Sequence, residues 1–233
     1  MAYAKSRNRR NKTDKVDALL LAEFGREREP EIKTRLMSLQ QGIARELEAL
    51  EEDLSRLKNR LEAASNGVAH PKVIASLKRR KKHLEKEKEE LKKQLQDELK
   101  QSKAQELKLL QSIPGIGIHT ASLLLAELDN PLRFKSARSL VAFAGLTPML
   151  HESGKTSRYT AISRMGSSHL RRWLYMPALA AIRLNKPLKA FYQKLVSKGK
   201  AKKVALVAVM AKLLKLVYGV LKHNKPFDPD YNA

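Results

Sequence analysis

The sequence predicts a mainly α-helical protein, in which a long antiparallel coiled-coil hairpin precedes a compact helical C-terminal domain that contains a helix-hairpin-helix. Leucines recur at spacings of three and four residues through two long segments, and Gly67 and Pro71 interrupt the pattern between them. Of the 233 residues, 42% are apolar but only 5% are aromatic, which favours a helical core of leucine and alanine. Cysteine is absent, so disulfide bonds and thiolate metal sites are excluded.

The charge of the chain points to a polyanionic partner. It has 47 Lys and Arg against 24 Asp and Glu, a formal net charge of +23. Such a surplus repels itself unless a polyanion neutralises it, and nucleic acid is the commonest partner of this kind. A membrane surface is the rival, but the longest apolar segment, 204–221, contains Lys212 and Lys215 and indicates a buried or amphipathic helix. Since residues 2–12 also lack the apolar core of a signal peptide, we expect a cytoplasmic, nucleoid-associated protein without a membrane partner.

Residues 1–28 are predicted to hold a basic arm and a short helix, DALLLAEFG, which Gly25 is expected to close. Two aspartates, Asp14 and Asp17, stand at the start of this helix in the stretch KTDKVDA. Carboxylates are favoured in a first turn by the exposed N–H groups and the helix dipole. Residues at i and i+3 also share a helix face, where two carboxylates can hold a divalent cation. The spacing does not choose between these readings.

Residues 29–104 are predicted to form the hairpin, each arm reaching roughly 50 Å at 1.5 Å per residue. The seam of the first arm consists of Leu36, Leu39, Ile43, Leu47, Leu50, Leu54, Leu57 and Leu61. The seam of the second arm consists of Ile74, Leu77, Leu84, Leu91 and Leu95. Lys81 and Lys88 occupy core positions of the second arm and weaken it. The run KRRKKHLEKEKEELKK is mixed in sign, which favours a solvated helix face over a dedicated nucleic-acid patch.

Residues 105–224 are predicted to form the compact C-terminal domain, with 225–233 as a tail. The stretch LLQSIPGIGIHTASLLLAEL has the pattern of a helix-hairpin-helix. Gly115 and Gly117 would let the backbone turn tightly and bring N–H groups to a phosphate at a helix N-terminus. An ordinary turn between helices is the alternative. The basic composition favours phosphate binding, which would hold nucleic acid without reading bases.

A polar segment with a candidate nucleophile follows a predicted helix at 136–144. Residues 145–159 are rich in Gly, Pro, Ser and Thr and predict a loop or short hairpin, and a further helix is expected at 170–182. Ser153 is the candidate nucleophile, although a Ser-Gly pair alone is more often turn chemistry. The nearby cations would hold a phosphate and stabilise its transition state; they are Lys155, Arg158, Arg164, Arg171 and Arg172.

Several of these segments resemble, in the same order, the transposases of the insertion sequence 110 family, the bridge-RNA-guided DEDD group. The segments are KTDKVDALLLAEF, the leucine hairpin, IPGIGIHTASLLLAEL, LVAFAGLTPMLHESGKTS, ISRMGSSHLRRWLY and HNKPFDPDYNA. No single motif is decisive, and their order and spacing carry the resemblance from Lys12 to the C-terminus.

The resemblance implies a RuvC-like domain with four acidic residues, a coiled coil and a C-terminal transposase domain with a catalytic serine. Asp14 and Asp17 would be the last two acidic residues and would bind Mg²⁺. Ser153 would join transiently to a DNA phosphate. The implied partners are DNA, a guide RNA and further copies of the chain, which would associate through the coiled coil.

The sequence departs from the family pattern at its beginning. The first two acidic residues would lie upstream of the KTD motif, and only a dozen residues precede it here. We therefore expect residues 1–28 to be a remnant of the RuvC-like domain, in a truncated chain that is inactive alone. The alternatives are a non-catalytic nucleic-acid-binding coiled-coil protein and a basic scaffold for ribosomal RNA. The scaffold would explain the charge but not the order of the motifs.

Overall fold

The chain is mainly α-helical, as the sequence predicts, in a computed structural model that describes residues 14–28, 37–67, 69–153 and 156–229. At positions 14–17, 132, 150–153 and 156–161 it describes the backbone only. The chain divides into two compact units, residues 1–37 and residues 38–233. The first contains α2 (Asp14–Arg28).

Gly25 does not end α2, so this expectation is wrong. The helix continues through it to Arg28. Glycine lacks a positive φ at this position and therefore provides no helix cap. A glycine inside a helix costs about 1 kcal/mol relative to alanine, which lowers stability without stopping the helix.

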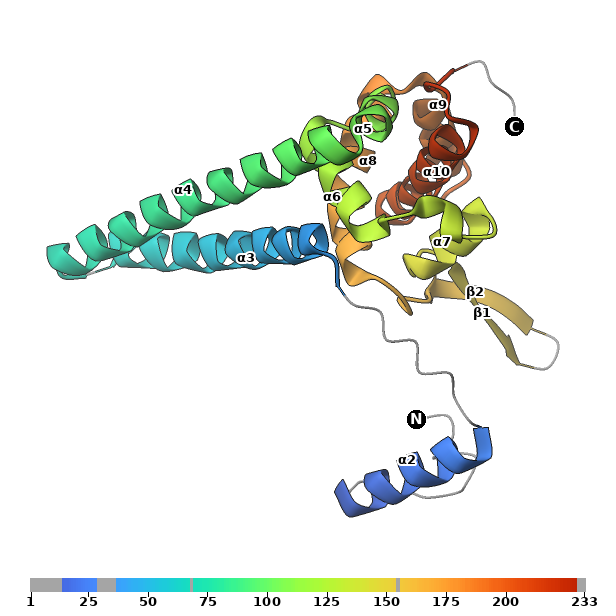
Figure 1. Ribbon diagram of the computed structural model, residues 1–233, viewed down its shortest axis with the longest axis horizontal. Coiled ribbons are helices and arrows are strands. Elements are labelled where there is room, and N and C mark those ends of the chain that lie inside the picture. Colours follow the sequence, from blue (N-terminus) through green and yellow to red (C-terminus); the bar gives the residue numbers. More distant parts are fainter. Residues whose placement is uncertain (1–13, 29–36, 68, 154–155, 230–233) are drawn as a thin grey trace. The chain divides into compact units, whose positions relative to one another are not determined.

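The second unit begins with two long helices, α3 (Leu39–Asn66) and α4 (Pro71–Ser102), which run side by side and project from the remaining helices (Figure 1). Ser38 begins α3 with a capping box, in which its hydroxyl accepts from the backbone N–H of Gln41. Pro71 stands in the first turn of α4, where its missing N–H costs nothing. The predicted antiparallel hairpin is confirmed, while its heptad register stays a prediction.

The apolar seam between the arms is buried in part. Its buried leucines are Leu47, Leu50, Leu54, Leu57, Leu77, Leu95 and Leu99. Leu39, by contrast, is 86% exposed, so the seam does not extend to the start of α3. Lys88 pairs across the hairpin with Glu51 at 2.8 Å, and Lys81 pairs with Glu85 on its own helix. Both lysines therefore direct their charge to carboxylates at the edge of the seam.

A bundle of helices follows the hairpin and holds the main core. Its elements are α5 (Ala104–Gln111), α6 (Ile118–Leu128), η1 (Pro131–Arg133), α7 (Ala137–Phe143), α8 (Ser168–Leu184), α9 (Lys186–Ser197) and α10 (Lys202–His223). By length and composition α10 is apolar enough to cross a membrane. It packs against α7, α8 and α9, however, and Leu213, Leu214 and Val217 are fully buried in the core. This is the buried helix that the sequence favours for 204–221.

A two-stranded ribbon, β1 (Pro148–Ser153) and β2 (Thr156–Ile162), joins α7 to α8. Three backbone hydrogen bonds fix its base: Ser167 donates to Phe143 at the end of α7, and Arg164 and Ser163 donate to Gly145 and Thr147, which follow this helix. Ser167 N–H donates to the carbonyl of Phe143 at 2.8 Å. Gly166 has φ +140°, and a Cβ there would lie 2.1 Å from the same carbonyl oxygen, so only glycine allows this close approach.

Candidate nucleic-acid site at the ribbon and the hairpin root

Ser153 is the last residue of β1 and pairs with Thr156, the first residue of β2. The structure therefore places it at the far end of the ribbon (Figure 1). Arg158 lies on β2 opposite His151. For Ser153 and Arg158 only the backbone is described, and Lys155 lies outside the described residues. The predicted loop or short hairpin at 145–159 is thus a hairpin that carries the candidate serine at its turn.

Arg164 is an exposed cation at the base of the ribbon, with the left-handed φ of +52°. This conformation costs a non-glycine residue about 1 kcal/mol. Its backbone N–H donates to the carbonyl of Gly145 at 3.2 Å. No described residue forms an ion pair with its guanidinium. Of the predicted phosphate ligands whose side chains are described, Arg164 is the one best able to meet a phosphate directly.

Arg171 and Arg172, the other predicted phosphate ligands, have partners within the fold. Arg171 donates to the carbonyls of Ala144 at 2.9 Å and Ser167 at 3.3 Å, and so ties α8 to the end of α7. Arg172 forms ion pairs with Glu48, at 2.7 Å, and with Glu52, both on α3. The hydrogen bond from Arg172 holds the pKa of Glu52 below its ordinary value, and the Glu52 carboxylate raises the pKa of Arg172. Nucleic-acid binding by these two arginines stays a prediction.

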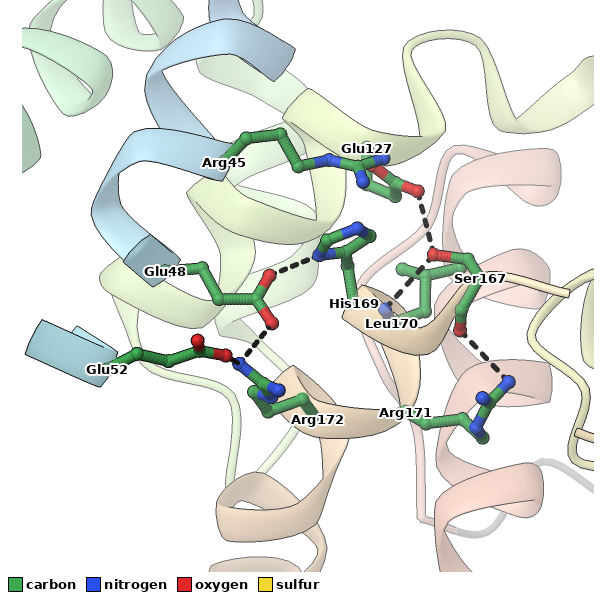
Figure 2. A network of polar contacts seen from close by, with 9 residues as sticks. All are labelled: Arg45, Glu48, Glu52, Glu127, Ser167, His169, Leu170, Arg171 and Arg172. Carbon is green, nitrogen blue, oxygen red and sulfur yellow. Dashed lines mark hydrogen bonds and ion pairs between the residues drawn. The ribbon is translucent and has the colours of Figure 1, made fainter. Parts of the chain in front are cut away.

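The first part of α3 is attached to α6 and α8 through a polar network (Figure 2). We call this part the root of the hairpin; its contacting residues are Gln41, Arg45, Glu48 and Glu52. Glu48 has a side chain only 8% exposed, and it contacts both Arg172 and the Nδ1 atom of His169. One nearly buried carboxylate on α3 therefore fixes the first turn of α8.

Glu127 on α6 is the second buried carboxylate of the root, with a side chain 3% exposed. Arg45 Nη2 donates to one of its oxygens at 2.8 Å, and the Ser167 hydroxyl donates to the other at 2.8 Å. Ser167 is also the N-cap of α8, since its oxygen accepts from Leu170 N–H. Gln41 donates to the backbone carbonyl of Glu127 at 3.0 Å. Glu127 thus joins α3, α6 and α8.

These root residues were missed by reasoning from the sequence. The available signal was Glu127 itself, a single acidic residue in the apolar run ASLLLAEL. A charge in a buried helix is expensive unless it is paired, so an acidic residue there predicts a partner. Ser167, just before an apolar helix, was a recognisable N-cap.

Gly115 and Gly117 have different surroundings in the turn between α5 and α6. Gly115 has φ +105°, and a Cβ there would lie 2.8 Å from the backbone nitrogen of Ala181 on α8. Its lack of a side chain is required for packing. Gly117 is the exposed N-cap of α6, and nothing lies within 4 Å of the position of its Cβ. Of the two, only Gly117 offers an open approach to the first turn of α6, and phosphate binding by this turn stays a prediction.

Comparisons with known proteins indicate the family to which this chain belongs. The family model described as Transposase IS116/IS110/IS902 family matches residues 107–193. The pilin gene-inverting protein of Moraxella bovis is 32% identical over 241 residues, covering 97% of this chain and 71% of its own. The chain belongs to this transposase family. A transposase for the insertion sequence element IS1111A of Coxiella burnetii is 31% identical over 121 residues, covering 51% of this chain and 33% of its own.

The part that matches the IS116/IS110/IS902 transposase family begins in α5 and ends in α9. It therefore contains the turn with Gly115 and Gly117, the buried Glu127, the whole ribbon and α8. The Moraxella bovis relative extends the similarity over the hairpin as well, because the match covers 97% of the chain. The ribbon and the root therefore both lie within the match to the Moraxella bovis relative.

Magnesium, which the family resemblance implies, has an incomplete set of ligands in the described chain. Asp14 and Asp17 are the first and fourth residues of α2, so they share one face of the helix. Their carboxylates are the hard oxygen ligands that Mg²⁺ prefers, but an octahedral site requires about six ligands. Among the described residues, no group of three or more His, Asp or Glu is placed to hold a metal. Asp14 and Asp17 could therefore supply some, but not all, of the ligands of a magnesium site.

Proposed function

We propose, in place of the sequence-based expectation of a chain that is inactive alone, that this chain is a DNA recombinase of an insertion sequence, which binds DNA and exchanges strands through Ser153. The observation that carries the proposal is the position of Ser153, at the turn of a ribbon whose base is fixed to α7 and α8. Such a ribbon places the backbone of Ser153 at its far end while its base stays attached beside α7. The net charge of +23 and the exposed guanidinium of Arg164, which no described residue pairs with, support a phosphate-rich substrate. The similar Moraxella protein is named for inverting a gene, which is a DNA rearrangement.

In the proposed reaction, the Ser153 oxygen attacks a backbone phosphorus of DNA. A bond forms from this oxygen to phosphorus, and the bond from phosphorus to one deoxyribose oxygen breaks. The deoxyribose oxygen leaves as a hydroxyl group after taking up the proton that the serine loses. The phosphodiester is replaced by a phosphoserine diester, so a hydroxyl of a second strand can reverse the step and join the strands anew.

Cations would assist at two places. Arg164, with Lys155 and Arg158 of the ribbon, would hold the phosphate and offset the charge that develops on its oxygens. Asp14 and Asp17 would contribute ligands to Mg²⁺, which when bound supplies positive charge as a Lewis acid. A guide RNA would direct the choice of DNA, and the hairpin would join copies of the chain.

A non-catalytic nucleic-acid-binding protein is the second candidate function. The net charge of +23 favours it, because phosphate binding alone would explain this surplus. It would use the same cations and the same hairpin without forming a bond to DNA.

The two functions differ in whether a covalent adduct forms. The purified chain is incubated with Mg²⁺, with RNA transcribed from the insertion sequence that encodes it, and with labelled duplex DNA from the two ends of that insertion sequence. The reaction is stopped with detergent. We expect an adduct that resists detergent, disappears with Ser153→Ala and persists with Ser157→Ala, a control on the facing strand of the ribbon. DNA binding without any adduct would reject the serine mechanism and leave the non-catalytic function.

A further inference from the structure

The outer half of the hairpin contains a groove between α3 and α4 that the serine mechanism does not use. Its volume is about 540 Å³. The groove is lined by Asp53, Arg56, Leu57, Arg60, Arg79, Arg80, His83 and Leu84. The lining thus contains four arginines and a histidine, one aspartate and two leucines. We call it the arginine groove.

Most cations of the arginine groove have no partner among the residues that the structure describes. Arg56 pairs with Asp53 at 3.1 Å and with Glu52 at 3.4 Å along its own helix. Arg60, Arg79 and Arg80 are exposed, and no described residue forms an ion pair or hydrogen bond with them. Like charges held close together repel one another, and an anion bound among them would relieve that repulsion. The groove is therefore suited to an external anion.

The arrangement of the arginines fits a chain of phosphates better than a single small anion. Arg56 and Arg60 are one turn apart on α3, so they follow each other along the same face. Arg79 and Arg80 supply further guanidinium groups from α4 across the groove. Each planar guanidinium can donate two parallel hydrogen bonds to a phosphate. Arg56 and Arg60 can contact successive phosphates of one strand, and Arg79 and Arg80 can contact the same strand from α4.

We propose that the arginine groove binds the phosphate backbone of duplex DNA, as a second contact in addition to the ribbon. Proteins that bind single strands stack successive bases on several aromatic side chains, whereas His83 is the one ring in this lining, so duplex is favoured over single-stranded nucleic acid. Arg60 lies twelve residues beyond Glu48 of the root, about 18 Å along the helix axis. The contact rests on the proposed function only in taking DNA as the partner.

The test measures DNA affinity in the full chain as a function of salt. The variant Arg60→Gln, Arg79→Gln, Arg80→Gln removes the three unpaired cations. The control variant Lys58→Gln, Lys82→Gln, Lys93→Gln removes the same charge from exposed positions of the hairpin that do not line the groove. The probes are a duplex DNA of arbitrary sequence and a stem-loop RNA with the same number of phosphates, and circular dichroism checks the helical content of both variants.

For the groove variant we expect the slope of log affinity against log salt to decrease by about 2.7 on duplex DNA, roughly 0.9 for each lost phosphate contact. At physiological salt this corresponds to a loss of affinity between roughly tenfold and a hundredfold. The control should change the slope by about 1 or less, because scattered exposed charges act only through the general field.

Four outcomes would overturn the proposal. Equal losses in the two variants would mean that only net charge matters. A loss confined to the stem-loop RNA would assign the groove to RNA. A wild-type chain that binds no duplex DNA would reject both this contact and the proposed function. If the groove variant lost no DNA affinity while the covalent adduct still formed, the groove contact alone would be rejected.

Discussion

The root of the hairpin and its outer half carry similar residues in opposite situations. At the root, Glu48 and Glu127 are nearly buried, and each holds a cation from another helix. In the outer half, Arg60 and Arg80 are exposed and pair with no described residue. Charged residues at the root thus position helices, while those of the outer half remain available to a partner. The same composition supports structure at one end of α3 and binding at the other.

This difference predicts how substitutions divide between the two regions. A paired charge in a buried site is costly to disturb because its partner loses a hydrogen bond without gaining water. An exposed charge has water on all sides, so its removal alters the free energy of unfolding little. Changes at the root should therefore reduce stability, and changes in the outer half should reduce binding. Four variants test this contrast, and they are taken from the largest expected effect to the smallest.

Gly115→Ala should have the largest effect, because the root requires α6 and α8 to lie close together. The new Cβ would lie 2.8 Å from the backbone of Ala181 in α8, and alanine would be forced to φ +105°. We expect a loss of about 3 kcal/mol in the free energy of unfolding, measured by denaturant titration. The control is Gly117→Ala, which has no atom near the new Cβ and should lose at most about 1 kcal/mol.

The same pair of variants separates packing from phosphate binding in this turn. If Gly115→Ala kept the stability of the wild type, the close approach of the turn to α8 would be refuted. If Gly117→Ala weakened DNA binding at unchanged stability, the helix-hairpin-helix prediction would gain support, since Gly117 lies in open space at the start of α6.

Glu127→Gln should reduce stability by about 2 kcal/mol. The amide keeps the shape of the carboxylate but removes the charge that holds Arg45, whose side chain is 35% exposed and can recover some water. It also weakens the bond that the Ser167 hydroxyl donates. The measurement is again denaturant unfolding, with the exposed Glu62→Gln of α3 as a control that should change it by about 0.5 kcal/mol or less. Equal effects of the two variants would contradict a structural role for the root.

The sequence predicted the elements better than the contacts between them. The spacing of leucines is a local signal, and it correctly predicted the two arms of the hairpin. The apolar segment after the polar loop likewise predicted the helix around 170–182. The partners of Arg172 lie on α3, with Glu52 removed by 120 residues, and local periodicity contains no information about such a pair. Similarly, the sequence showed that PGIG needs glycine, but not that Ala181 is the reason at Gly115.

For the candidate site at the ribbon, the sequence likewise predicted the segment but not the contacts of its side chains. The pattern around Ser153 identified a polar segment with nearby cations, and the structure places that serine at the end of a ribbon. It did not distinguish Arg164, whose side chain has no partner in the described chain, from Arg171, which donates to backbone carbonyls. That distinction depends on how α7 and α8 meet. The sequence also did not show which cations of the outer half have partners, because the run around Arg79 is mixed in sign along the chain.

His119 at the start of α6 should make the root sensitive to acid. Burial lowers the pKa of His119 from its ordinary 6.5, and the charges of Lys92 and Lys88 lower it further. Its Nδ1 atom is buried without a hydrogen-bond partner among the described residues. The folded chain therefore favours the neutral ring, while the unfolded chain takes up a proton as the pH falls below about 6.5.

Stability should thus be fully present well above pH 6.5 and decrease as the pH falls through that value towards the lowered pKa of the folded chain. His119→Gln should make this part of the pH dependence smaller, since the amide does not titrate. The measurement is the free energy of unfolding at several pH values in the same buffer. An unchanged pH profile in the variant would show that other groups cause the loss in acid.

Arg60→Gln in the outer half should have the smallest effect on stability, about 0.5 kcal/mol or less, because the guanidinium is exposed and pairs with no described carboxylate. Removing one of several like charges also relieves repulsion within the arginine groove, which opposes the small loss of packing along its stem. Denaturant titration of this variant beside Glu127→Gln compares the two regions directly. A loss as large as that of Glu127→Gln would mean that the outer half is also held together by its charges, and its cations would then no longer be free for a partner.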